Sequence, residues 1–301
     1  PMRADLGWSY FTAGAMNTFN AAGYLVGALA APWLMRRIGA RKALIGGSLL
    51  AAAILALHGL VRADVALYAL RLATGVASAA VFVAGGLMAA RLGNRPALGP
   101  GITPSLVLGL YYGGTGLGIV ASALLVPSLV AWPLWSVQGW AQAWIALGAG
   151  AALATVPMAR HAHEVAAAPA ATPTTTAHAH FTLRPFAFGL AGYFMFGLGY
   201  IGYMTFIVTL LREQQLATGT VVAFYVVLGL GVMASPWLWA GLLQRSRGGQ
   251  ALARLNALLA LATALPVLMP HAAVAFVSGA LFGGGFLSVV ASTTALVRHN
   301  L

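Results

Sequence analysis

The sequence predicts an all-α polytopic membrane protein, on the evidence of its composition, the length of its apolar stretches and the placement of its charges. Of the 301 residues, 60% are apolar and 7% are charged, whereas soluble domains have about 45–50% apolar and about 25% charged residues. Apolar stretches of the length that crosses a bilayer as a helix recur along the chain. Because backbone groups in lipid must be satisfied within the segment, helices are the expected form.

We predict nine membrane-spanning helices, separated by short polar or proline-containing connections. The expected ranges are 13–35, 43–61, 65–90, 105–130, 140–159, 185–210, 219–243, 251–269 and 273–297.

The cations indicate which side of the membrane each connection faces, because Lys and Arg in short loops are retained in the cytoplasm. One side carries only Arg3, Arg62 and Arg212, each within two residues of an acid. The other side carries twelve cations: Arg36, Arg37, Arg41, Lys42, Arg91, Arg95, Arg160, Arg184, Arg245, Arg247, Arg254 and Arg298. We predict that this second side is cytoplasmic, which places the N-terminus outside and the C-terminus inside.

The longest connection, residues 160–184, is rich in Ala, Pro and Thr and predicts a flexible cytoplasmic linker. It divides the chain into an expected N-terminal bundle of five spans, residues 1–159, and a C-terminal bundle of four spans, residues 185–301. The same linker contains two HxH pairs, His161 with His163 and His178 with His180. Imidazoles can bind transition metals, but no carboxylate or cysteine completes a defined geometry here, so we predict no metal site.

A weak internal repeat connects the two predicted bundles. The sequence APWLM at 31–35 recurs as SPWLW at 235–239, and each copy is followed by a basic, glycine-containing loop and an Ala/Leu-rich span. Both copies close a span that runs from outside to inside. Parallel repeats of this kind are typical of one large class of transporters, in which the substrate binds between the halves near the membrane midplane.

Four segments carry a family resemblance: RRIGARK (36–42), LRLATGVASAA (70–80), GLYYGGTGLG (109–118) and GYFMFGLGYIGYMTF (192–206). They resemble, in order, the basic loop after the second helix, the fourth-helix motif, the glycine-rich fifth helix and the seventh helix of the major facilitator superfamily. The chain is most similar to the YbfB/YjiJ branch. The resemblance implies a secondary active transporter for a small organic solute, working by alternating access between two bundles. It also implies that the nine spans are helices 2–10 of twelve, so the chain is expected to be a fragment.

Two of the segments place individual residues on the family's motifs. In the basic loop, Arg37, Gly39, Arg41 and Lys42 fit the pattern, whereas Arg36 stands where the family usually has an acid. In the fourth-helix motif, Arg71 and Gly75 lie on matching positions.

Arg71 is the strongest candidate for a substrate-binding residue, because it is the one charged side chain well inside a predicted span. Gly75 and Ser78 follow it on one helical face. The alternative is that Arg71 reaches back to the outer interface with its long side chain. Polar and aromatic side chains suited to an amphipathic or aromatic solute also recur at helical spacing in other spans. These further candidates are Asn17, Asn20, Tyr24, Tyr112, Thr115, Tyr200 and Tyr203.

No Asp or Glu lies within a predicted span, so the usual carboxylate for proton coupling is absent there. Either it belongs to a helix outside this chain, or transport is not coupled to protons, or Arg71 binds an anionic substrate directly. We predict no enzyme activity and no cofactor, because HEVAA at 163–167 is not HExxH and no in-span acid accompanies a serine nucleophile. The expected partners are a small-molecule substrate, the lipid bilayer and, as one option, a coupling proton, with no nucleic acid. The expected state is a monomer in the bacterial inner membrane, and the alternative function is a non-transporting or inactive membrane protein.

Overall fold

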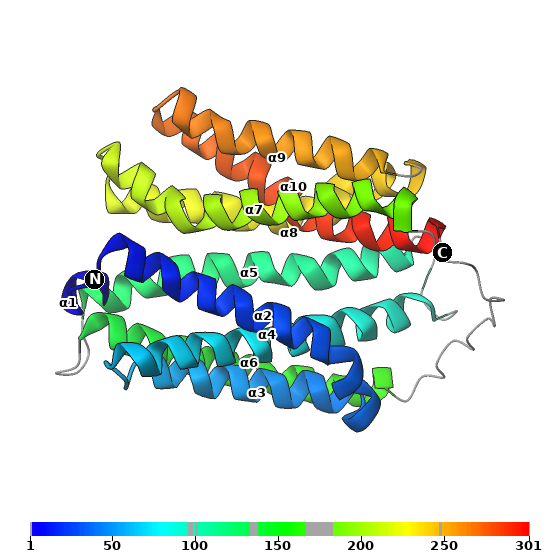
Figure 1. The fold of residues 1–301 in the computed structure, drawn as a ribbon, viewed down its shortest axis with the longest axis horizontal. Coiled ribbons are helices and arrows are strands. Elements are labelled where there is room, and N and C mark those ends of the chain that lie inside the picture. The colour runs from blue at the N-terminus through cyan, green and yellow to red at the C-terminus, as the bar shows by residue number, and fades with distance from the viewer. Residues whose placement is uncertain are drawn as a thin grey trace. The chain divides into compact units, whose positions relative to one another are not determined.

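A computed structural model describes residues 2–95, 99, 102–132, 138–166, 183–246 and 249–300. Within these ranges all regular secondary structure is helical (Figure 1). The helices are α1 (Met2–Asp5), α2 (Tyr10–Ile38), α3 (Ala40–His58), α4 (Asp64–Gly93), α5 (Pro104–Ala131), α6 (Gly139–Ala166), α7 (Leu183–Glu213), α8 (Thr218–Arg245), α9 (Gln250–Leu268) and α10 (Ala272–Asn300). The predicted all-α fold is confirmed, with one long helix for each predicted span.

Eight of these helices, α3 to α10, are long and apolar enough to cross a membrane. The first predicted span, residues 13–35, lies within α2, which has 29 residues but is not among the eight. The physical reason is composition, since the first half of α2 contains Thr12, Asn17, Thr18 and Asn20. Length and apolar composition therefore support eight of the nine predicted spans. Helix α2 is long enough for a span but has a more polar composition.

The predicted linker, residues 160–184, is only partly within the described residues. Helix α6 continues to Ala166 and α7 begins at Leu183, so residues 160–166 extend α6. Alanine, arginine and glutamate in this stretch are good helix formers. Residues 167–182, including His178 and His180, lie outside the described residues.

Internal contacts divide the chain into two units. Unit 1 comprises Pro1–Leu92 and Leu125–Ala170, and unit 2 comprises Gly93–Leu124 and Ala171–Leu301. Most of α5 belongs to unit 2, because its glycines pack closely on α8. The division into bundles at residues 1–159 and 185–301 follows the order of the chain and stays a prediction.

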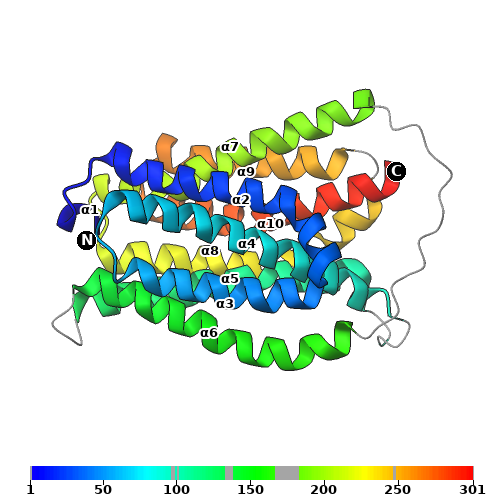
Figure 2. The same cartoon turned by 60° about the horizontal axis from the view of Figure 1, so that its bottom comes forward.

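In unit 1, α2 lies beside α4 and α3 beside α6 (Figure 2), and small residues let these helices meet backbone to backbone. Helix α2 meets α4 through Gly23 and Gly75, where an added Cβ would run into the backbone of the opposite helix. Helices α3 and α6 meet in the same way at Gly148, whose Cβ would lie 2.6 Å from the Ala52 carbonyl oxygen. Close approach of this kind is how helices associate in a bilayer, where burial of apolar surface gives little driving force.

Unit 2 uses the same packing. Helix α8 meets α10 at Gly283 and α5 at Gly116. An added Cβ at Gly116 would collide with the Gly229 carbonyl oxygen and the Met233 side chain of α8. Gly109 approaches Pro236 of α8 at 2.8 Å by the same measure. The repeated PWL sequence falls in the last turns of two helices, with Pro32 in α2 and Pro236 in α8.

Helices α2 and α3 are joined by a single residue, Gly39. Its φ of +82° lies in the region that only glycine adopts readily. The Gly39 amide donates to the Met35 carbonyl at 2.9 Å and its carbonyl accepts from the Ala43 amide at 3.1 Å, so it closes one helix and opens the next.

Candidate functional site

Arg71, two turns inside α4, lies against an aromatic ring rather than an acid. Its guanidinium carbon is 4.7 Å from the centre of the Trp144 ring of α6. Within the described part of the chain there is one ion pair, Arg62–Asp5 at 3.9 Å, so Arg71 has no acidic partner there. A cation over a tryptophan ring gains about 0.5–2 kcal/mol, and its positive charge stays uncompensated.

The Trp144 ring also contacts His58, the last residue of α3. The two rings are stacked, with centres 4.8 Å apart and planes 26° apart. His58 is 0% exposed, and its Nδ1 lies 2.8 Å from the Ile54 carbonyl oxygen. Its Nε2 has no hydrogen-bond partner among the described residues. A buried polar group without a partner costs about 1–3 kcal/mol. Arg71, Trp144 and His58 thus form a cluster contributed by α4, α6 and α3.

Sequence reasoning missed His58 and Trp144. A usable signal was present, because His58 is the one histidine within a predicted span and ionisable residues inside spans are rare and usually functional. Trp144 had no such signal, since its role depends on which helices lie beside α6.

The predicted site residues of α2 and α4 lie together, mainly in the contact between these helices. The Asn20 amide nitrogen donates to the Arg71 carbonyl oxygen at 3.1 Å. Gly75 is buried against the backbone of Asn20 and Tyr24, and the Ser78 hydroxyl donates to the Gly75 carbonyl at 2.9 Å. The Tyr24 ring meets the Phe82 ring edge-on, 6.3 Å between centres. Asn17 is exposed on α2.

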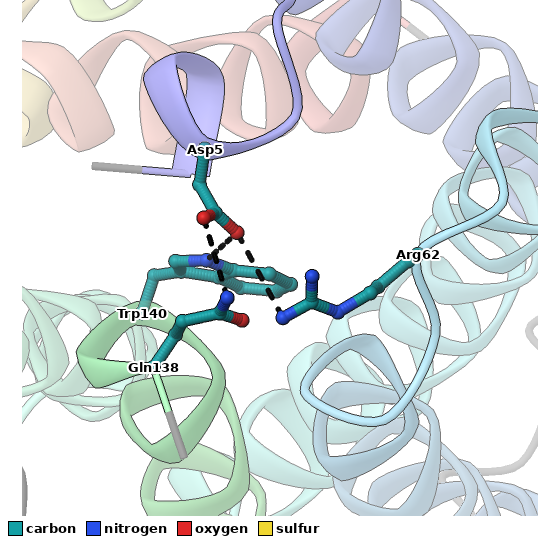
Figure 3. Close-up of polar contacts among 4 residues, drawn as sticks. All are labelled: Asp5, Arg62, Gln138 and Trp140. Carbon is teal, nitrogen blue, oxygen red and sulfur yellow. Dashed lines mark hydrogen bonds and ion pairs between the residues drawn. The ribbon is translucent and has the colours of Figure 1, made fainter. Parts of the chain in front are cut away.

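A polar network closes the end of unit 1 that we predict to face outside (Figure 3). The Asp5 carboxylate accepts from the Trp140 indole at 2.9 Å and from the Gln138 amide at 3.3 Å, and it pairs with Arg62. Asp64 accepts from the Trp8 indole at 2.7 Å. The acids of this end therefore bind indole donors, and Arg62 pairs with Asp5 rather than with its sequence neighbour Asp64.

The predicted tyrosines of α7 face α10 within unit 2. The Tyr200 ring stacks on Phe286 at 4.8 Å and the Tyr203 ring on Phe282 at 4.0 Å. Tyr203 is buried, and its hydroxyl is 2.7 Å from the Ser278 hydroxyl, which in turn donates to the Ala262 carbonyl. These contacts place Tyr203 in the packing core of unit 2 and Tyr200 at its partly exposed edge.

A groove of about 480 Å³ lies between α7 and α9 of unit 2. Tyr203, Phe206 and Val267 give it an apolar wall, while Thr209 and Glu213 add polar groups. Of the remaining predicted residues, Tyr112 of α5 is buried beside Ser235, Pro236 and Ser288, and Thr115 is exposed on α5.

The basic loop residues flank the α2–α3 junction. The Arg37 guanidinium carbon lies 5.5 Å from the Trp33 ring centre, and Lys42 is exposed. The Arg41 Nε is buried and has no hydrogen-bond partner within the ranges that the structure describes. Gly39 forms the junction itself. In the described residues no group of three or more His, Asp or Glu is placed to hold a metal ion.

Long apolar helices packed through glycines, with a cation inside one of them, define a polytopic helical membrane protein. The family described as "Uncharacterised MFS-type transporter YbfB" matches residues 1–301. The chain belongs to this family, a branch of the major facilitator superfamily, and is a multi-pass integral membrane protein of a transporter class rather than an enzyme class. No curated protein is similar enough to the chain to count as a match.

Proposed function

We propose that the protein is a secondary active transporter for a small organic solute that carries an anionic group. Transport would proceed by alternating access, with the two predicted bundles as the moving bodies. The protein would act as a monomer in the bacterial inner membrane. The observation that carries the proposal is the guanidinium of Arg71, which lies within a membrane helix with no acidic partner among the described residues.

The physical argument is the cost of an uncompensated charge in a membrane helix, about 2.5–3.5 kcal/mol on insertion scales. A carboxylate or phosphate on the substrate would supply the missing countercharge, and Arg suits both groups because its fork of donors binds them in pairs. The Trp144 ring, already against the guanidinium, would hold its plane in place. The candidate residues Asn17, Asn20, Tyr24, Gly75, Ser78, Tyr112, Thr115, Tyr200 and Tyr203 remain proposals for the solute path.

The first experiment finds the substrate. Purified full-length protein is screened by thermal shift against small organic anions, sugars and aromatic drugs. We expect stabilisation by organic anions, because a ligand that binds the folded state raises its stability by mass action. Stabilisation by neutral sugars alone would contradict the anionic class.

The second experiment tests Arg71 by transport in proteoliposomes. Arg71→Ala should lower uptake of the identified anion about 10- to 100-fold, which corresponds to loss of one charge-assisted hydrogen-bonded contact of about 1.5–3 kcal/mol. Arg71→Lys keeps the charge but not the paired donor geometry. Its uptake should lie between that of Arg71→Ala and that of the natural sequence. Arg212→Ala, an exposed arginine at the end of α7, is the matched control. Unchanged uptake by a folded Arg71→Ala protein would exclude Arg71 from the mechanism.

A further inference from the structure

The tautomer of His58 follows from its hydrogen bond. The Ile54 carbonyl oxygen, 2.8 Å from Nδ1, can only accept. Nδ1 therefore carries the hydrogen of the neutral ring, and Nε2 carries the lone pair. Nε2 is buried, and the described residues provide no donor for it. His58 is thus a neutral imidazole with a vacant proton-accepting nitrogen inside a membrane helix bundle.

Arg71 carries a positive charge close to the His58 ring, because both side chains lie against the same aromatic residue. Both side chains contact the Trp144 ring, whose centre is 4.8 Å from the His58 ring centre and 4.7 Å from the Arg71 guanidinium carbon. Trp144, which faces His58 from α6, does not titrate.

The other charged groups at this end of unit 1 already have partners, and Arg3 of α1 donates to the Trp8 carbonyl oxygen. Arg62, in the connection after α3, pairs with Asp5 of α1. Asp64, at the start of α4, accepts from the Trp8 indole. In the described part of unit 1 the charge on His58 is therefore governed by Arg71 and by whatever neutralises Arg71.

We propose that His58 Nε2 binds the coupling proton of the transport cycle and that this proton moves together with an anionic substrate bound at Arg71. The proposal rests on the proposed function, since it requires an anion at Arg71. Two cations in contact with one aromatic ring inside the helix bundle repel each other, because the surrounding dielectric is lower than that of water. An anion on Arg71 removes that repulsion and attracts the imidazolium, so anion and proton each increase the affinity for the other.

The proton balance of the cycle is simple. A proton from water adds to the Nε2 lone pair while Nδ1–H keeps its bond to Ile54, giving an imidazolium that carries a single added charge. When the anion leaves Arg71, repulsion returns and Nε2 releases the proton on the same side. The coupled reaction is symport of one proton with one substrate anion, and it needs no acidic residue in the spans.

Proton binding can be measured without knowing the substrate. Full-length protein with ¹⁵N-labelled histidine is placed in nanodiscs, and the His58 signals are assigned by their loss in His58→Gln. The ring is titrated between about pH 5 and pH 8 in chloride, and again with benzoate, citrate or inorganic phosphate as anion probes.

We expect protonation at Nε2, with proton affinity at least about five-fold higher in the presence of one of the probes, in the range of ordinary coupling between sites. This increase should disappear in Arg71→Gln, and in Arg71→Lys it should persist at reduced size. The proposal is overturned if His58 stays neutral throughout with every probe, or if the anion effect is the same without the Arg71 charge.

Transport gives an independent readout. In proteoliposomes, substrate uptake is measured with a ten-fold higher proton concentration outside and again with equal pH on both sides. The gradient ratio is the first uptake divided by the second. We expect a ratio of about ten or more for the natural sequence, because a ten-fold proton gradient supplies about 1.4 kcal/mol, and a ratio near one for His58→Gln. His271→Gln, which alters an exposed histidine between α9 and α10, should keep the ratio of the natural sequence.

The two proposals fail in different ways. If Arg71→Ala transports normally, the proposed function loses its substrate site. If Arg71→Ala abolishes transport but His58→Gln keeps the full gradient ratio, the substrate site stands and the proton site at His58 is wrong.

Discussion

Gly75 sets how closely α4 approaches α2. It lies one turn beyond Arg71, and a Cβ at this position would collide with the Asn20 carbonyl oxygen of α2. The same approach lets the Asn20 amide reach the Arg71 carbonyl at 3.1 Å. Together with Gly23 of α2, Gly75 therefore sets the helix spacing and the register that holds Arg71.

This predicts a large difference between two Gly-to-Ala substitutions. Gly75→Ala should destabilise the protein by about 1–3 kcal/mol, the usual cost of overpacking. Gly114→Ala, on α5 with no atom within 4 Å of an added Cβ, should be neutral or stabilise by up to about 1 kcal/mol through helix propensity. Thermal or denaturant unfolding in detergent measures both variants. Equal stability of the two would contradict the packing contact.

The contrast between Arg71 and His58 shows what single residues reveal in sequence. A lone charge in an apolar run is visible without any structure, so Arg71 could be predicted as a candidate. The unpaired Nε2 of His58 could not be predicted, because it depends on the Ile54 carbonyl, on Trp144 and on the absence of a donor in the described part of the chain. Likewise, Gly75 fits a motif in sequence, but only packing shows that it contacts α2.

The short helix α1 is an element whose stability comes from tertiary contacts. It has four residues, too short to be stable alone. Asp5 ties it to Trp140 and Gln138 at α6 and to Arg62 before α4 (Figure 3). The Asp5 carboxylate is therefore a main polar anchor of α1, beside the packing of Met2 on the apolar cluster of Trp8, Met16 and Leu67.

Asp5→Ala should release α1 from unit 1. Hydrogen bonds to a charged group are worth about 1.5–3 kcal/mol, so amide hydrogen exchange at residues 2–8 should accelerate about ten-fold or more. Glu213→Ala removes an exposed acid at the end of α7 and should leave exchange at residues 2–8 unchanged. If exchange there is as slow in Asp5→Ala as in the natural sequence, the carboxylate does not hold α1.

The length of the apolar stretches predicted the positions of the helices well, but their first and last residues less well. Each predicted span lies largely within one long helix, because a bilayer imposes about 20 apolar residues on any such segment. The ends follow local chemistry instead. Helix α3 ends at His58, three residues before the predicted limit of 61, and α6 continues to Ala166 through polar residues that still favour helix. The pairing of acids with indoles rather than with neighbouring arginines also required the fold.

For the whole molecule, the predicted orientation is directly testable because the chain has no cysteine. Two exposed positions are suitable, Ala63 between α3 and α4 and Gln250 at the start of α9. In intact cells a membrane-impermeant maleimide should label Ala63→Cys and not Gln250→Cys. After permeabilisation both should react.

The reverse labelling pattern would invert the predicted orientation. Labelling of both positions in intact cells would mean that the helices between them do not cross the membrane as predicted. The unaltered chain serves as the control, since it has no thiol to react.

Gly39 has a mechanical consequence. Because a single residue joins α2 to α3, no flexible loop separates the two helices. A rotation of α2 is therefore transmitted to α3. With 19 residues, α3 is a rigid arm about 28 Å long. His58 is the last residue of α3, so a rotation of a few degrees at Gly39 would displace it by about one to two ångström. A displacement of this size is enough to change whether the His58 and Trp144 rings stay stacked.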